Sequence, residues 1–262
     1  MPVPLRVITT TNEGLVRQIA VSNNRQVAVR SSAFRAHDTQ QLRLADRFAE
    51  MGIYYERQEG AFENLRAAKP SKFIDTYQNS YGRPLRMEDL AQVIAIVCDQ
   101  WALSTAAKSD LFEDKIYIEI FSDVHTSDLR LLVFLVNLHI VMPLVLKDLR
   151  KKSAVLSELP IGRFRFPAVK ILAKYVCRHH PKHIAEFGDA TIGRVGAEHP
   201  LRVWLGKLTA AQNSGLQQLL PKHWMESDQW KNATDPASVA KALRDLRLDS
   251  FGVFEQDLAT TT

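Results

Sequence analysis

The run of apolar residues from Leu129 to Leu146 constrains the fold more than any other part of the sequence. Its length approaches the ~20 residues that an α-helix needs to span a bilayer. Four residues within it are unfavourable in an isolated helix that faces lipid, namely Arg130 at its start, Asn137 and His139 in its middle and Pro143 near its end. We therefore expect this run to form a buried central helix, with no membrane association.

The composition and the N-terminus agree with a folded, cytoplasmic protein. Of 262 residues, 46% are hydrophobic and 24% are charged, which excludes collagen-like, low-complexity and wholly disordered chains. The two cysteines cannot form a disulfide scaffold, and they lack the paired spacing of a structural zinc site. The first residues show no basic segment followed by an apolar one, so we expect no secretory signal.

Elsewhere, apolar residues recur mostly at helical spacing, and strand-like segments are few. We expect helices over residues 31–48, 87–102, 109–121, 126–152, 167–180, 198–219 and 236–246. Two short strands are expected at 5–8 and 53–57, with a helix through Ile19 between them. Polar or proline-containing connections are expected at 64–84 and 157–167. The predicted fold class is mainly α with a small N-terminal α/β element of few strands.

These elements group into three predicted regions. Residues 1–65 form the small α/β region, and residues 66–156 form a helical region around the buried central helix. Residues 157–262 form a basic, C-terminal helical region. No repeat of fixed period occurs, so the sequence does not indicate a solenoid.

Positive charge is concentrated between residues 147 and 183. The whole chain has a net charge of +5, whereas this segment has ten Lys or Arg against two acidic residues, a local +8. Phe164, Phe166 and Tyr175 are interleaved with the cations, a combination found in proteins that bind single-stranded nucleic acid. The same pattern also fits a helix whose basic side chains simply face solvent. The candidate nucleic-acid-binding residues are Lys151, Lys152, Arg163, Arg165, Lys170, Lys174 and Arg178.

Two shorter runs are rich in polar side chains. Residues 20–38 bring carboxamides and guanidinium groups to the junction of two predicted helices, where they can form a hydrogen-bonded turn or contact a polar ligand. Residues 52–60 are typical of a strand, in which Arg57 and Glu59 share one face and can form an ion pair.

Together these runs resemble a bacterial family, the abortive phage infection proteins known as AIPR, over roughly residues 3–122. The resemblance rests on an Asn-x-Gln run, an Arg-x-x-Asp step and a Tyr-Tyr-Glu-Arg strand that ends in Gly. Residues 107–113 also resemble the family's Lys-Ser-x-Leu-Phe step. The motif residues are Asn24, Arg25, Gln26, Arg35, Asp38, Tyr54, Tyr55, Glu56, Arg57 and Gly60.

The chain also departs from the family pattern. Gln58 and Glu59 replace a Lys-Arg pair, which removes cations that would favour an anion at the strand. The long N-terminal half usual in the family is missing upstream of Leu5, so the chain resembles a C-terminal portion or a truncated relative. A separate N-terminal half or other defence proteins are therefore expected as partners. The resemblance implies defence against phage, in which an infected cell stops growing or dies, and it implies no settled catalytic set.

Two clusters are candidates for chemistry. Glu113, Asp114 and Lys115 bring carboxylates and an amine together, as a metal-dependent nuclease requires, although such spacing on a helix also gives an exposed acidic face. The densest set of zinc-binding side chains is Cys177, His179, His180 and His183, of which Cys177, His179 and His183 are the candidate ligands. No second half-site accompanies them, so a polar helix end is their alternative use. The sequence has no nucleotide-binding loop, hydrolase elbow or zincin helix, and no cofactor is expected.

The leading functional prediction is an anti-phage defence protein that contacts nucleic acid through its basic segment. Arg25, Gln26 and Arg35 would form a second polar surface. One alternative is a metal-dependent nuclease or nuclease subunit that uses Glu113, Asp114 and Lys115. Another is a scaffold whose basic face binds an acidic protein rather than nucleic acid.

Overall fold

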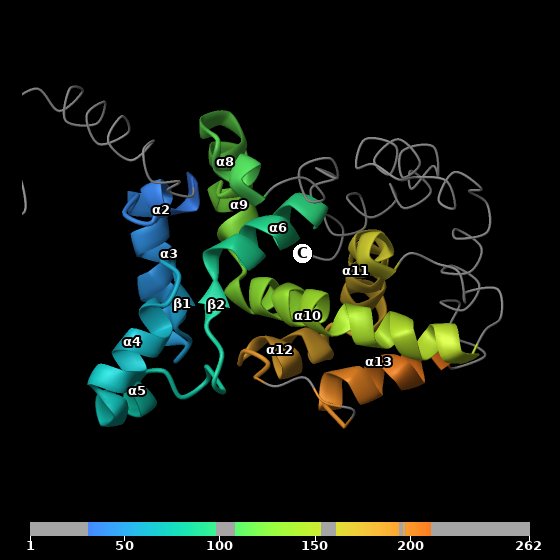
Figure 1. Ribbon diagram of the computed structural model, residues 1–262. Helices are drawn as coiled ribbons and strands as arrows, with labels where there is room; N and C mark the ends of the chain where they lie inside the picture. Colours follow the sequence, from blue (N-terminus) through green and yellow to red (C-terminus); the bar gives the residue numbers. More distant parts are fainter. Residues whose placement is uncertain (1–30, 98–107, 153–160, 194–195, 197, 211–262) are drawn as a thin grey trace, which may run out of the picture.

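The computed structural model describes residues 31–97, 108–152, 161–193, 196 and 198–210 (Figure 1). Within these ranges the regular secondary structure is helical apart from two short strands, which confirms the predicted, mainly α fold class. Predictions for residues 1–30, which include Asn24, Arg25 and Gln26, lie outside the described residues. The same holds for residues 211–262, which include the helix expected over 236–246.

The helix predicted over residues 31–48 is divided in two. Helix α2 spans Ser31–Arg35 and helix α3 spans Thr39–Glu50. A turn separates them, in which Asp38 N donates to Arg35 O at 3.0 Å, and Asp38 has extended backbone angles. From α3, Gln41, Leu44 and Phe48 are buried at the spacing of one helical face.

The sheet has two parallel strands, β1 at Tyr55–Glu56 and β2 at Leu85–Arg86, with Tyr55 paired to Leu85. Between them lie α4 (Ala61–Ala68) and α5 (Pro70–Thr76), so the connection predicted over 64–84 is wrong for most of its length. Aromatic packing accounts for these short helices. Phe62 and Phe73 are buried with ring centroids 5.0 Å apart, and the Tyr54 ring contacts both.

Among the described residues, four elements follow β2 before the central helix. They are α6 (Met87–Val97), the 3-10 helix η1 (Lys108–Phe112), α8 (Asp114–Ile120) and α9 (Asp123–Thr126). The helix predicted over 87–102 is therefore confirmed as far as Val97, where the description stops. The helix predicted over 109–121 is interrupted at Glu113, which has extended backbone angles and caps α8.

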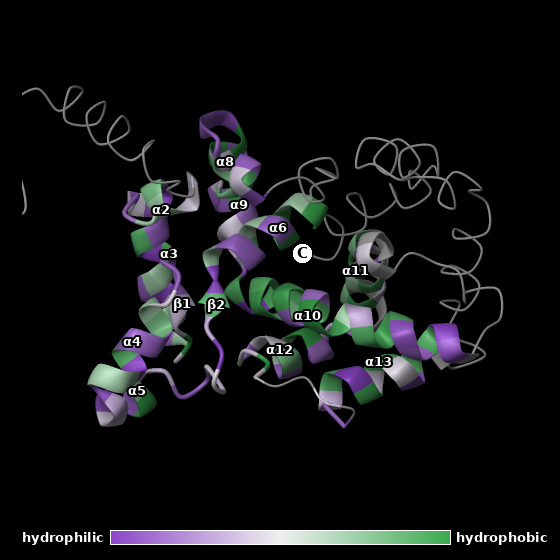
Figure 2. Cartoon of the chain, viewed as in Figure 1, coloured by the Kyte–Doolittle hydropathy of each residue, from purple (hydrophilic) through white to green (hydrophobic). Residues whose placement is uncertain are grey.

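Helix α10 (Leu129–Lys152) is the centre of the core, as predicted for this apolar run. It contacts α6, α11 (Ile161–His179), α12 (Lys182–Gly188) and α13 (Pro200–Ala210) (Figure 1). Figure 2 shows its first part as almost uniformly hydrophobic and its end as hydrophilic. By length and composition alone it could cross a bilayer, but 67% of its most apolar window is buried within the structure, as in the core helix of a soluble protein.

The later helices begin and end differently from the prediction. Helix α11 starts at Ile161, so the connection predicted over 157–167 is wrong from that residue onward, and α12 was not predicted. The predicted three-region division stays a prediction, although β1 and β2 pair across its boundary at residue 65.

Candidate functional site

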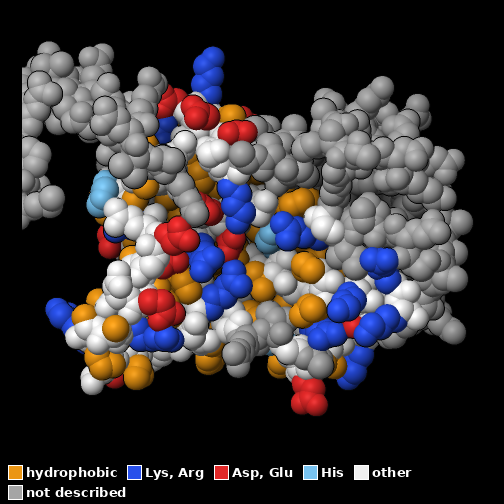
Figure 3. Space-filling view, viewed as in Figure 1, with side chains coloured by type: hydrophobic (Ala, Val, Ile, Leu, Met, Phe, Trp, Pro, Cys, Tyr) orange, Lys and Arg blue, Asp and Glu red, His pale blue; other side chains and the backbone are white. Residues whose placement is uncertain are grey.

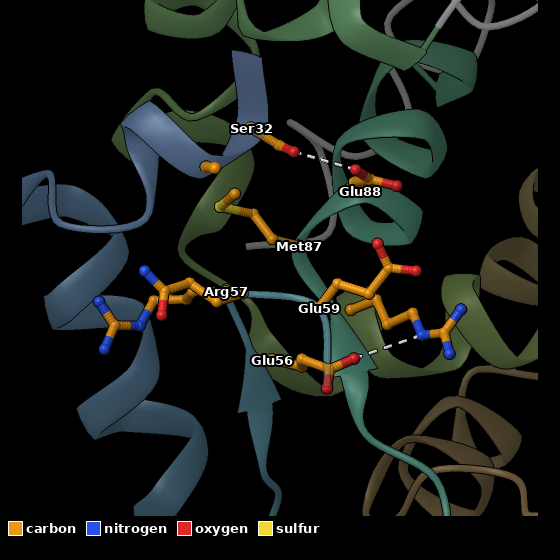
Figure 4. Close-up of a pocket in the computed structure, with 9 residues that line it drawn as sticks. Ser32, Glu56, Arg57, Glu59, Met87 and Glu88 are labelled. Carbon is orange, nitrogen blue, oxygen red and sulfur yellow. Dashed lines mark hydrogen bonds and ion pairs between the residues drawn. The ribbon is translucent and has the colours of Figure 1, made fainter. Parts of the chain in front are cut away.

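A polar cavity of about 410 Å³ lies where the two parallel strands end (Figure 4). Side chains that follow the carboxyl ends of parallel strands are common ligand contacts in α/β sheets. The lining residues come from α2, from β1 and the turn after it, and from β2 and the start of α6. They are Ser32, Ala33, Glu56, Arg57, Gln58, Glu59, Arg86, Met87 and Glu88.

The charged groups of this cavity mostly bind one another or the backbone. Glu56 is 6% exposed, and its Oε1 accepts from Phe62 N at 3.1 Å while its Oε2 lies 3.4 Å from Arg86 Nε. Glu88 accepts from Ser32 Oγ at 2.9 Å. Arg57 and Glu59 point in opposite directions from the strand end, and Arg57 donates to the backbone carbonyl of the α2–α3 turn (Figure 4). This arrangement differs from the predicted Arg57–Glu59 pair.

The Arg-x-x-Asp step of the family motif holds helices together. Arg35 Nε donates to Phe112 O at 3.2 Å, and its terminal nitrogens bind the carboxylates of Asp38 and Asp114. The Arg35 guanidinium also lies 4.4 Å from the Tyr117 ring centroid. With only 13% of its side chain exposed, Arg35 ties α2 to η1 and α8.

A buried hydrogen-bond chain completes this connection. Tyr55 Oη donates to Gln41 Oε1 at 2.6 Å, and Gln41 Nε2 donates to Tyr117 Oη at 3.1 Å. Burial raises the pKa of the Tyr55 phenol well above its usual value, so it stays protonated as a donor. Gly60 has a φ of +81° and precedes α4, a backbone angle that glycine adopts readily. The described motif residues therefore have structural roles.

The candidate nuclease residues lie at the start of α8. Glu113, Asp114 and Lys115 are all exposed, and Asp114 is engaged by Arg35. Among the residues that the structure describes, no group of three His, Cys, Asp or Glu could hold a metal ion.

The candidate zinc ligands lie near the end of α11 and in α12. Burial raises the pKa of the Cys177 thiol to about 11, so it is protonated near neutral pH, whereas zinc binds the thiolate. His183 pairs with Glu186 and packs against the Trp204 ring at 4.4 Å. The side chain of His179 lies outside the described set.

The predicted nucleic-acid-binding residues have different environments. Lys151 is exposed at the end of α10, but Lys170 is only 4% exposed, so the prediction that it faces solvent is wrong. It is buried because α11 packs against α6 and α10. Arg165 is half-buried, with its guanidinium 4.6 Å from the Phe166 ring centroid, and burial lowers its pKa. The side chains of Lys152, Arg163, Lys174 and Arg178 are not among those described.

A basic surface forms where the later parts of α10 and α13 lie side by side. Arg202 binds Asp148 with two nitrogens, at 2.9 Å from Nε and 2.6 Å from Nη2. Figure 3 shows Lys and Arg side chains gathered over this region. We define the α10–α13 basic surface as Lys147, Arg150, Lys151, Arg202 and Lys207. The sequence analysis missed the α13 cations because they lie some 50 residues from α10 along the chain.

A second cluster of charged side chains surrounds Asp89 in the first turn of α6. The sequence analysis did not identify it either. Arg83 Nη2 donates to Asp89 Oδ2 at 2.8 Å, and Lys108 Nζ donates to Asp89 Oδ1 at 3.1 Å. Burial alone would raise the pKa of Asp89, but Lys108 and Arg83 lower it below its usual value. Asp89 is therefore an ionised carboxylate held between cations.

The fold and these sites define a mainly helical protein with a two-stranded parallel sheet, a polar cavity at its edge and two clusters of cations. Comparison with known families matches residues 1–154 to the family described as AIPR protein. The match covers more than half of the chain, so the chain belongs to the AIPR family, and membership suggests a role in abortive infection against phage. No curated protein and no solved structure matches the chain.

Proposed function

We propose that this chain acts in abortive infection against phage by binding nucleic acid through the α10–α13 basic surface. The supporting observation is the clustering of exposed cations on two adjacent helices. Lys147 and Lys151 are four residues apart on α10, hence on one helical face, and both are exposed. On α13, Lys207 is exposed and Arg202 is held beside α10 by its pair with Asp148.

Such a surface suits phosphate groups in a row. Lysines one helical turn apart are about 6 Å from each other along the axis, close to the spacing of phosphates in an extended strand. Cations that neutralise phosphates release condensed counterions, so the affinity must fall steeply as salt rises. A lysine ammonium binds phosphate oxygens as a point charge, which favours contact with the backbone over recognition of bases.

Fluorescence anisotropy of the purified full chain tests the proposal with labelled single-stranded DNA, duplex DNA and RNA over a salt series. The double variant Lys147→Gln/Lys151→Gln should bind more weakly. For duplex DNA it should reduce the slope of log K against log salt by about 2, at ~0.9 per phosphate contact. The matched control is Lys69→Gln/Lys72→Gln, which removes two exposed lysines near α5, outside the basic surface.

The outcomes are separable. Equal slopes for the two double variants, or no binding near physiological salt, would reject the basic surface as a nucleic-acid interface. Parallel samples with Mg²⁺ or Mn²⁺ should show binding without cutting. Metal-dependent cleavage that is abolished by Glu113→Gln would instead support the nuclease alternative.

A further inference from the structure

We define the Asp89 cluster as Arg83, Asp89, Lys108, His139 and Arg165. It joins three cations from three parts of the fold. Arg83 precedes β2, Lys108 begins η1, and Arg165 lies on α11. Only Asp89 contributes a negative charge, so the cluster has a net charge of +2 when His139 is neutral. The side chains of Arg83 and Lys108 are 29% and 40% exposed, so ligands can reach it from solvent.

Two buried polar atoms at this cluster have no hydrogen-bond partner. They are Nδ1 of His139, whose residue is only 6% exposed, and Nε of Arg165. Native proteins pair nearly all such atoms, so two neighbouring exceptions require an explanation. Both side chains contact Phe166. The His139 ring stacks on Phe166 at 5.8 Å, and the Arg165 guanidinium lies 4.6 Å from the same ring centroid.

The electrostatics place the charges of the cluster around His139. The pKa of its imidazole is lowered from 6.5 to about 4, mainly by burial and next by Arg165. Asp89 opposes this shift, and Lys108 and Arg83 add to it. The imidazole is therefore neutral near pH 7, and it can donate from Nδ1 in one tautomer. Arg165 Nε is always a donor. Two buried donors, one of them on the cation Arg165, thus lie in a cluster that also contains the cations Lys108 and Arg83.

We propose that the Asp89 cluster binds a phosphate group. A phosphate monoester carries close to two negative charges near neutral pH, which matches the net charge of the cluster. Its oxygens can accept from Arg165 Nε and His139 Nδ1, the two donors that lack partners. Asp89 repels an anion, but it also fixes Arg83 and Lys108 in place by hydrogen bonds of 2.8 and 3.1 Å. The cluster shares no residue with the α10–α13 basic surface, and the proposal does not depend on that surface.

Two arms of one experiment identify the source of the phosphate. In the first, isothermal titration calorimetry of the full chain uses inorganic phosphate and phenyl phosphate. In the second, anisotropy compares an oligonucleotide carrying a 5′-phosphate with the same oligonucleotide carrying a 5′-hydroxyl. Binding in the first arm indicates a free phosphate or small monoester. A preference for the 5′-phosphate with no binding in the first arm indicates a nucleic-acid end.

Variants connect the binding to these residues. Lys108→Gln and Arg165→Gln should each weaken phosphate binding at least tenfold, whereas Lys151→Gln, on the other surface, should not change it. Because Lys108 is partly exposed, we expect Lys108→Gln to fold. It therefore still tests the site if Arg165→Gln fails to fold. Nitrogen NMR of His139 adds a second readout, because bound phosphate should raise the pKa of its imidazole.

The proposal is overturned if neither arm shows phosphate-dependent binding, or if Lys108→Gln binds phosphate as the wild type does. Its failure is distinct from that of the nucleic-acid proposal. If the double variant Lys147→Gln/Lys151→Gln still binds phosphate and also binds oligonucleotides with the salt dependence of the wild type, only the α10–α13 surface is rejected as a binding site.

Discussion

Asn137 of α10 binds the backbone of Ile192, which lies 55 residues further along the chain. Its Oδ1 accepts from Ile192 N at 3.0 Å, and its Nδ2 donates to Phe187 O at 2.7 Å and Ala190 O at 2.8 Å. The residue is 1% exposed. A polar side chain in the apolar part of α10 therefore satisfies three backbone groups and fixes the segment after α12 against the core.

Replacing Asn137 with Ala should destabilise the protein by about 2–4 kcal/mol, because three hydrogen bonds are lost and buried backbone groups are left unpaired. Urea unfolding followed by circular dichroism measures this change. Asn64→Ala, at an exposed position in α4, is the control and should stay within about 0.5 kcal/mol of the wild type. Similar midpoints for the two variants would contradict the structural role of Asn137.

Two glycines near this segment allow close backbone approach. A Cβ at Gly188 would lie 2.3 Å from Arg130 O, and a Cβ at Gly193 would lie 2.1 Å from Tyr81 O. Gly188→Ala and Gly193→Ala should each cost about 1–3 kcal/mol, since backbone must move. Gly206→Ala is the matched control. It has open space around it within α13 and should stabilise the helix by roughly 0.5–1 kcal/mol, as thermal unfolding would show.

The sequence was sufficient to predict elements whose evidence is local. The apolar run predicted a buried α10, and the Tyr-Tyr-Glu-Arg run predicted β1, because composition and periodicity over a few residues carry that information. The partner strand β2 has only two residues, too few for an alternating pattern. The short helices α4 and α5 depend on the Phe62–Phe73 aromatic contact rather than on a long apolar stripe.

Site residues were harder to predict, because their partners are remote in sequence. Lys170 looked like part of a solvent-exposed basic face, yet α6 and α10 bury it. Asn137 and His139 were identified only as interruptions of an apolar helix. Their roles depend on residues 187–192 and on Arg165, which no window around α10 contains. Tertiary contacts, not propensity, decide these environments.

Arg35→Lys should destabilise the protein by about 1–3 kcal/mol. Lysine keeps the charge but loses the planar group that binds Phe112 O and two carboxylates at once. Asp114→Asn should cost less than about 1 kcal/mol, since Asp114 is 85% exposed and exposed ion pairs contribute little. Chemical denaturation of both variants gives the comparison. Equal losses would mean that Arg35 acts mainly through the exposed pair rather than through its buried contacts.

The stability of the protein should fall as the pH drops from about 6.5 to about 4, because of His139. Burial lowers the pKa of its imidazole from 6.5 to about 4, so between these values the unfolded chain binds a proton that the folded chain does not. Stability then rises with pH across this window, by up to roughly 3 kcal/mol for a shift of this size. Denaturant midpoints at several pH values, in phosphate-free buffer, measure the profile.

His139→Gln removes the titrating group and should flatten the profile between pH 4 and 6.5, even if the variant is less stable overall. His37→Gln, at an exposed position in the turn between α2 and α3, should keep the dependence of the wild type. The comparison cancels the contribution of carboxylates, which titrate in the same range in all three proteins. If His139→Gln and the wild type lose stability in parallel on acidification, the imidazole is not held neutral by the core.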